Sequence, residues 1–160
     1  MAWLADLEPL ARVGLAMLLG AFIGVDREVA HKPAGLRTHM LLAGASALFT
    51  EIGMAMLRQY GSGNSLSTRV DPIVIIQAVA AAVGFIGAGT ILRRGDEHIE
   101  GLTTATSLLL TAAVGVAVSS GHAALGLGVT VLALVTLRGV RRIEDRIRKR
   151  RRGGSGPGSS

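Results

Sequence analysis

Apolar residues form five long runs along the chain, and short polar segments separate them. The runs cover residues 9–25, 38–57, 72–92, 102–120 and 122–138. Each run is close to the roughly 20 residues that a helix needs to cross the hydrocarbon core of a bilayer. The pattern therefore predicts an all-α fold, a polytopic membrane helix bundle of about five transmembrane helices.

The last two runs are joined only by the segment "SGH" around Gly121. They could therefore also form one long broken helix or a re-entrant pair. An even number of spans would place the N-terminus inside, and this is the main competing topology.

The positions of Lys and Arg favour five spans with the N-terminus outside and the C-terminus inside. In this arrangement only Arg12, Arg58 and Arg69 lie on the outer side, and the other 14 of the 17 basic residues lie on the inner side. Basic residues in short loops resist translocation, so the reversed topology is disfavoured. The predicted orientation is N-out, C-in.

Composition supports a membrane protein and excludes several other classes. The 160 residues are 49% hydrophobic and 18% charged, which is too apolar for a soluble domain of this size. The chain has no cysteine, so disulfides and thiolate metal sites are excluded. Nucleic-acid binding is not expected, because nine basic residues cluster between Arg138 and Arg152 without the aromatic residues that base stacking needs.

Three parts of the chain follow from this organisation. Residues 1–138 form the transmembrane helical domain, and residues 153–160, "GGSGPGSS", form a flexible linker or a cloning remnant. Between them, residues 139–152 form a basic amphipathic cytoplasmic tail with Val140, Ile143 and Ile147 on one helical face. The tail is either a helix at the anionic surface of the inner leaflet or a solvated segment that stops translocation.

Small residues recur at helical spacing in three of the runs. In lipid, helices associate through close backbone packing and hydrogen bonds, so small residues mark contact faces. These faces could serve packing within the chain or a homodimer or other homo-oligomer. The glycines expected to pack in this way are Gly20, Gly24, Gly84, Gly87 and Gly89.

Four motifs follow one another in order: "GAFIGVDRE", "KPAGLRTHMLLAGASALFT", "GFIGAGTIL" and "GLTTATSLLLTAAVGVAVSSG". Together they resemble the membrane domain of the MgtC/SapB family over about residues 14–121. The resemblance implies a multi-pass protein of the bacterial inner membrane that is linked to Mg²⁺ homeostasis. In some members it also implies virulence in a host and restraint of the F-type ATP synthase, and it implies no enzymatic reaction.

The chain departs from the family pattern at two positions. Asp26 stands where members commonly have Glu, and Leu109 stands where they commonly have an aromatic residue. The first change keeps the charge, whereas the second removes a ring that could contact a partner. Many members also have a soluble C-terminal domain, so the chain is expected to be a short form or a truncation.

Polar residues inside the predicted spans fall into two layers. Arg12, Glu51 and Gln77 lie about five residues, or about 8 Å, from the outer ends of their spans. An ionised carboxylate at this depth costs several kcal/mol unless it is paired. We expect this outer-half layer to contain an Arg12–Glu51 pair, and the alternative is that Glu51 lies beside Arg58.

The second layer lies at the cytoplasmic ends of the spans. Its carboxylates and hydroxyls would suit a hard cation such as Mg²⁺, and no other cofactor is expected. The alternative is a network of helix caps and ion pairs, joining Asp26 or Glu28 to Arg37 or Arg93, that fixes the bundle. The candidate residues are Asp26, Arg27, Glu28, Arg37, Thr38, His39, Thr90, Thr103, Thr104 and Thr106.

Two functions are compatible with these observations. The chain could be a membrane-embedded regulator that binds another membrane complex, such as the F-type ATP synthase, through its small-residue faces. It could instead be a transporter of ions or small solutes that uses the cytoplasmic polar layer and Glu51. The sequence favours the regulator, because it contains neither an inverted repeat nor a matched pair of broken helices.

Overall fold

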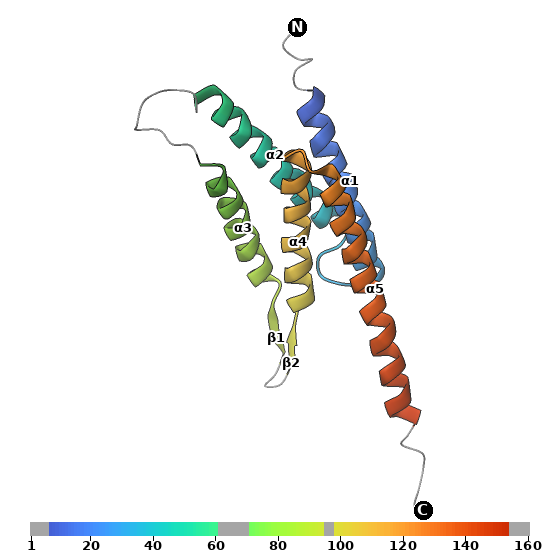
Figure 1. The fold of residues 1–160 in the computed structure, drawn as a ribbon. Helices are drawn as coiled ribbons and strands as arrows, with labels where there is room; N and C mark the ends of the chain where they lie inside the picture. Colours follow the sequence, from blue (N-terminus) through green and yellow to red (C-terminus); the bar gives the residue numbers. More distant parts are fainter. Residues whose placement is uncertain (1–6, 61–70, 95–97, 154–160) are drawn as a thin grey trace, which may run out of the picture.

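The structure, a computed structural model, describes residues 7–60, 71–94 and 98–153, and this part of the chain contains five helices (Figure 1). They are α1 (Leu7–Val29), α2 (Leu36–Tyr60), α3 (Pro72–Gly89), α4 (Leu102–Ser119) and α5 (Ala123–Gly153). Each helix has a segment long and apolar enough to cross a membrane. The predicted five-span helical bundle is confirmed, and the predicted starts lie within two residues of the observed ones. Its orientation in the membrane stays a prediction.

A short antiparallel hairpin joins α3 to α4. Its strands are β1 (Leu92–Arg94) and β2 (His98–Glu100), and Leu92 pairs with Glu100 in their register. The hairpin extends beyond the ends of α3 and α4, on the side of the bundle toward which α5 continues (Figure 1).

The helix α4 lies at the centre of the bundle and packs against each of the other four helices. Half of its apolar segment is buried, compared with 17% of the corresponding segment of α3. As Figure 1 shows, α3 lies on the side of α4 that faces away from α1. It is therefore a peripheral helix with most of its surface facing outward.

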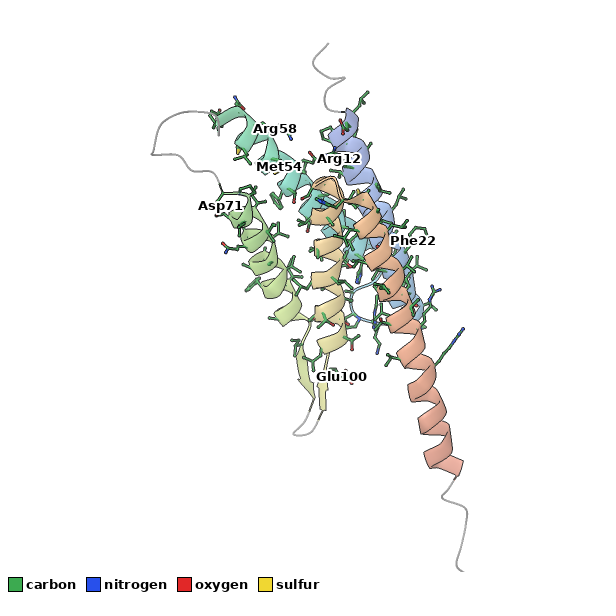
Figure 2. All side chains as sticks on the ribbon, viewed as in Figure 1. Arg12, Phe22, Met54, Arg58, Asp71 and Glu100 are labelled. Atoms are coloured by element: carbon green, nitrogen blue, oxygen red, sulfur yellow. The ribbon has the colours of Figure 1, made fainter. Side chains whose placement is uncertain are left out.

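Large apolar side chains point outward from the bundle. Phe22 is 59% exposed, Phe85 is 84% exposed, and Figure 2 shows Phe22 projecting away from the other helices. In water such exposure would be costly, whereas acyl chains solvate these side chains well. This distribution agrees with a bundle surrounded by lipid.

Small and medium-sized residues fill the interior. One buried cluster joins α1, α2 and α4, and it consists of Ala16, Leu19, Ala43, Ala47, Val114 and Val118. A second cluster joins α3 and α4 to the α1–α2 connection, and it consists of Ala34, Val79, Val83, Leu108 and Ala112. The abundance of alanine lets the helix backbones approach closely.

The predicted glycine contacts are present at the α1–α2 crossing. A Cβ atom at Gly20 would lie 2.6 Å from the carbonyl oxygen of His39, and one at Gly24 would lie 2.7 Å from the Cα of Leu36. These distances are too short for any side chain. Gly20 and Gly24 therefore serve the packing of α1 against α2 within the chain.

On α3 the glycine prediction is correct only in part. Gly87 packs against Ala105, where an added Cβ would lie 3.3 Å from the Ala105 Cβ. An added Cβ at Gly84 or Gly89 would meet no atom of another element within 4 Å, so neither glycine makes a close contact between helices of the described chain, and their packing in a homo-oligomer stays a prediction. Both glycines face outward because α3 touches its neighbours along only one narrow side.

The fourth and fifth spans are separate helices joined by a tight turn. Gly121 has a φ of +86° in this turn, a conformation that favours glycine. Beyond the turn, α5 continues without a break through residue 138 to Gly153. The predicted basic tail therefore continues the last span as one helix.

Candidate functional site

A polar cluster around Arg12 joins α1, α2 and α4. Its Nη1 atom lies 3.4 Å from Oε1 of Glu51 and donates a 3.1 Å hydrogen bond to the carbonyl oxygen of Ser119. Its Nη2 atom contacts Glu8 on the same helix. The carboxylate of Glu51 is 6% exposed, and Figure 2 shows Arg12 beside the α4–α5 turn.

This cluster has the predicted Arg12–Glu51 pair and adds a contact that the sequence did not reveal. The guanidinium of Arg12 binds a carbonyl at the C-terminal end of α4, where helix carbonyls lack partners within the helix. The Ser119 hydroxyl in turn donates to the carbonyl of Ala47. The cluster therefore fixes the first turns of α1 and the last turn of α4 against the middle of α2.

Gln77 does not join this cluster. It is exposed on α3, the peripheral helix, whereas Arg12 and Glu51 face the interior between α1, α2 and α4. The predicted layer grouped Gln77 with Arg12 and Glu51 by depth alone, and its place in that layer stays a prediction. An almost uniformly apolar helix such as α3 gives no indication of which side faces the bundle.

At the other end of the bundle, Asp26 joins α1 to α5. The Nε atom of Arg138 donates a 2.9 Å hydrogen bond to Oδ1 of Asp26, and Asp26 is 8% exposed. The adjacent Arg27 is also buried. The partner of Asp26 is thus a residue 112 positions away in the chain, where the sequence predicted Arg37 or Arg93, and the side chain of Arg93 lies outside the described residues.

Glu28 stabilises the start of α2. Its Oε2 atom accepts a 3.0 Å hydrogen bond from the backbone N–H of Leu36, the first residue of that helix. The carboxylate lies against Gly35, where an added Cβ would overlap it. This contact satisfies a backbone donor at the helix start and places negative charge at the positive end of the helix dipole.

A buried hydrogen-bonded chain crosses from α2 to α4. The Nδ1 atom of His39 lies 2.9 Å from the carbonyl oxygen of Gly35, and its Nε2 atom lies 3.3 Å from the Ser107 hydroxyl. Ser107 donates to the carbonyl of Thr104. His39 has no exposed surface, so this chain is an internal connection between helices.

The remaining predicted residues of the cytoplasmic layer are dispersed. Arg37 and Thr38 are exposed, and the Thr90 hydroxyl donates to the carbonyl of Gly87. The Thr106 hydroxyl donates to carbonyls of its own helix. The N-cap of α4 is Gly101, which has no side-chain capping bond.

Thr103 and Thr104 line a polar cavity of about 500 Å³ between the α1–α2 connection and the start of α4. The sequence predicted carboxylates around such a vestibule, but Asp26 and Glu28 are engaged elsewhere. His31 and Lys32 of the α1–α2 connection line the cavity instead. The lining residues are His31, Lys32, Pro33, Glu100, Gly101, Leu102, Thr103 and Thr104.

The described residues offer no cage for a resident metal ion. Nowhere among them do three His, Asp or Glu side chains gather in a way that could hold one. The expected Mg²⁺ ligands Asp26 and Glu28 instead bind an arginine and a backbone amide. We therefore assign no structural metal centre to the cytoplasmic layer.

An apolar groove of about 190 Å³ runs between α3 and α4 on the outside of the bundle. Alanines form much of its floor, and exposed Leu109 lies on its wall. Gln77 follows Ile76 of this groove directly in the chain. The lining residues are Ile76, Val79, Ala80, Leu109, Ala112, Ala113, Val116 and Ala117.

Comparison with known proteins gives consistent matches. A family profile described as "MgtC family" matches residues 13–146. Protein SrpB of Synechococcus elongatus is 40% identical over 141 residues, which cover 83% of this chain and 75% of that protein. No solved structure matches the chain.

Two further relatives are longer than the region they share with this chain. The Escherichia coli K12 protein named "Putative magnesium transporter YhiD" is 41% identical over 133 residues, which cover 81% of this chain and 59% of that protein. Protein MgtC of Brucella abortus is 37% identical over 127 residues, which cover 78% of this chain and 49% of that protein. The shared part is the membrane bundle described above.

Proposed function

Because the chain belongs to the MgtC family, we propose that it is a bacterial inner-membrane protein of Mg²⁺ homeostasis that regulates another membrane complex without catalysing a reaction. The family match and the relative named as a magnesium transporter support the link to Mg²⁺. The partner class is a transmembrane complex, for which the F-type ATP synthase implied by the sequence resemblance is the first candidate.

The observation that carries this proposal is the α3–α4 groove, together with the exposed Gln77 on α3. A groove floored by alanines admits the backbone of another helix at short distance. Gln77 lies within a span and on the outer surface, where lipid offers its amide no hydrogen-bond partner. A partner helix with a polar side chain at the same depth would satisfy this amide.

Transport remains the second candidate, because one relative is named as a transporter and the bundle contains buried polar groups. The Arg12–Glu51 cluster and the His39–Ser107 chain would be the polar steps of such a path. However, the buried cluster of Ala16, Leu19, Ala43, Ala47, Val114 and Val118 packs α1, α2 and α4 together, and these are the helices that carry both polar groups. This packing supports regulation over conduction.

Substitution of the groove tests the regulatory proposal. Ala113→Leu would fill the groove from α4, whereas Ala124→Leu makes the same change at an exposed position of α5 outside it. We expect the first variant to lose complementation of a strain lacking its own copy during growth at low Mg²⁺, and the second to retain it. Equal complementation by both variants would contradict docking in the groove.

Ion flux separates regulation from transport. Purified protein in sealed liposomes should carry no Mg²⁺ or monovalent ions under an imposed gradient. A flux that Glu51→Gln abolishes would instead establish transport and overturn the regulatory proposal.

A further inference from the structure

We propose that the cavity between the α1–α2 connection and the start of α4 binds a phosphate group. This site is separate from the α3–α4 groove and does not depend on the regulatory proposal. The predicted topology places it on the cytoplasmic side, at the end of the bundle toward which α5 continues (Figure 1).

The first argument is the start of α4. The helix has 18 residues, and its N-cap, Gly101, provides no side-chain capping bond. The N–H of Ala105 donates to the carbonyl of Gly101 and is the first to have an acceptor within the helix. The N–H groups of the residues before it have no such acceptor, because no helical turn precedes them. These donors, together with the helix dipole, favour an anion at this end.

The second argument is Thr104, an independent polar group at the same place. Its side chain is buried, with 2% of the residue exposed, and it lines the cavity. Its hydroxyl makes no hydrogen bond to any residue that the structure describes, whereas Thr106, Ser107 and Thr111 on the same helix all donate to helix carbonyls. The Thr104 hydroxyl is thus available as a donor inside the cavity.

The third argument is the charge of the opposite wall. His31 and Lys32 line the cavity from the α1–α2 connection, and neither forms an ion pair within the described chain. Thr103 adds a second hydroxyl. One carboxylate, Glu100, also lines the cavity; it is exposed and already has an interaction partner, and Figure 2 shows it at the start of α4.

No residue other than glycine fits at position 101 beside the site. It has a φ of +95°, and an added Cβ would overlap the carbonyl of Thr90. The end of α3 and the start of α4 are therefore held together, so the donors at this helix start are fixed before any ligand arrives. A fixed set of donors lowers the entropy cost of binding.

A phosphate group could reach this cavity from two sources. One is a soluble phosphate or phosphate ester from the cytoplasm. The other is the headgroup of a phospholipid in the inner leaflet, since the cavity lies at the end of the spans. Both present the same oxygens to the amides, hydroxyls and ammonium group, so experiment must separate them.

The test uses the full chain, purified and kept in a maltoside detergent, which contains no phosphate group. Sodium orthophosphate is titrated at constant ionic strength against sodium chloride, and binding is followed by ³¹P NMR. We expect saturable binding that Lys32→Gln weakens at least roughly tenfold, because a charge-assisted hydrogen bond is lost. Lys32→Arg should retain binding because it keeps the charge.

A matched pair of threonine variants tests the buried hydroxyl. Thr104→Val removes the hydroxyl from the cavity with almost no change of shape, and we expect binding to weaken several-fold. Thr106→Val makes the same change on the same helix, at a hydroxyl already bound to helix carbonyls, and should leave binding unchanged. Equal affinities for the two variants would overturn the assignment of Thr104.

Native mass spectrometry of the detergent-purified protein distinguishes the two sources. If the ligand is a lipid headgroup, phospholipid remains bound to the parent protein and to Thr106→Val but not to Lys32→Gln, and orthophosphate binds weakly. If the ligand is soluble, orthophosphate binds and no phospholipid is retained. Absence of both, with circular dichroism showing folded protein, would refute the site.

Discussion

At the residue scale, the ion pair between Arg12 and Glu51 is unequal in its two members. Glu51 is 6% exposed and depends on Arg12, whereas Arg12 also contacts Glu8 and Ser119. We expect Arg12→Met to lower the free energy of unfolding by about 3 kcal/mol, since it leaves a buried carboxylate without its cation. Glu51→Gln should cost only about 1 kcal/mol. Equilibrium unfolding in mixed micelles measures both.

The double variant provides the control for this pair. If the two side chains interact as described, Arg12→Met with Glu51→Gln should cost less than the sum of the single changes. Strict additivity would show that the 3.4 Å contact contributes no coupling.

The glycines allow a second comparison at this scale. Gly20→Ala would place a Cβ 2.6 Å from the carbonyl oxygen of His39, so we expect a loss of about 1–3 kcal/mol in unfolding free energy. Gly84→Ala meets no neighbouring atom and should gain up to about 1 kcal/mol from helix propensity. The same unfolding assay checks both, and similar losses for both variants would contradict the assigned α1–α2 crossing.

Residue-level prediction from sequence was accurate for some groups and not for others. The membrane depth of Glu51 required a partner, and Arg12 was the cation at the same depth. The side of α3 that carries Gln77 and Gly84 could not be predicted, because a helix that is apolar on all sides has no amphipathic signal to fix its rotation. The Asp26–Arg138 contact was equally inaccessible, since it joins helices whose spatial neighbours the sequence does not specify.

At the element scale, Asp26 and Arg138 hold the last helix against the first. Their 2.9 Å hydrogen bond lies just where α5 passes from the apolar span into the basic segment. We expect Asp26→Asn to increase amide hydrogen exchange in residues 138–153, because the tail loses its charged anchor on α1. Exchange in α4 should remain unchanged.

A charge reversal distinguishes this pairing from a general effect of lost charge. Arg138→Asp alone should increase exchange in the same region, and Asp26→Arg combined with Arg138→Asp should restore protection. Persistent rapid exchange in the double variant would contradict a direct contact between the two side chains.

The helices themselves were the most predictable elements. The lengths of the apolar runs predicted five spans. Whether the fourth and fifth spans are separate helices was left open by the pattern, and the turn at Gly121 separates them. The strands β1 and β2 were not predicted, because they are only three residues each and carry charged residues. Such short strands leave too few positions for an alternating pattern to be recognised.

At the scale of the whole molecule, the bundle has a closely packed part and an open part. The helices α1, α2 and α4 meet around glycines and alanines, whereas α3 leaves a groove beside α4. This asymmetry is the reason to place partner binding on α3 and α4. It also predicts that docking depends on the groove rather than on the Arg12–Glu51 cluster.

Site-specific photo-crosslinking along α3 in intact cells tests this account most directly. A photoreactive residue at position 76 or 80, on the groove, should give an adduct with a different membrane protein, and Ala113→Leu or Gln77→Leu should abolish it. A photoreactive residue at position 125, on the exposed surface of α5, should give no such adduct. Adducts that contain only two copies of this chain, or an adduct that survives both substitutions, would contradict regulation through the α3–α4 groove.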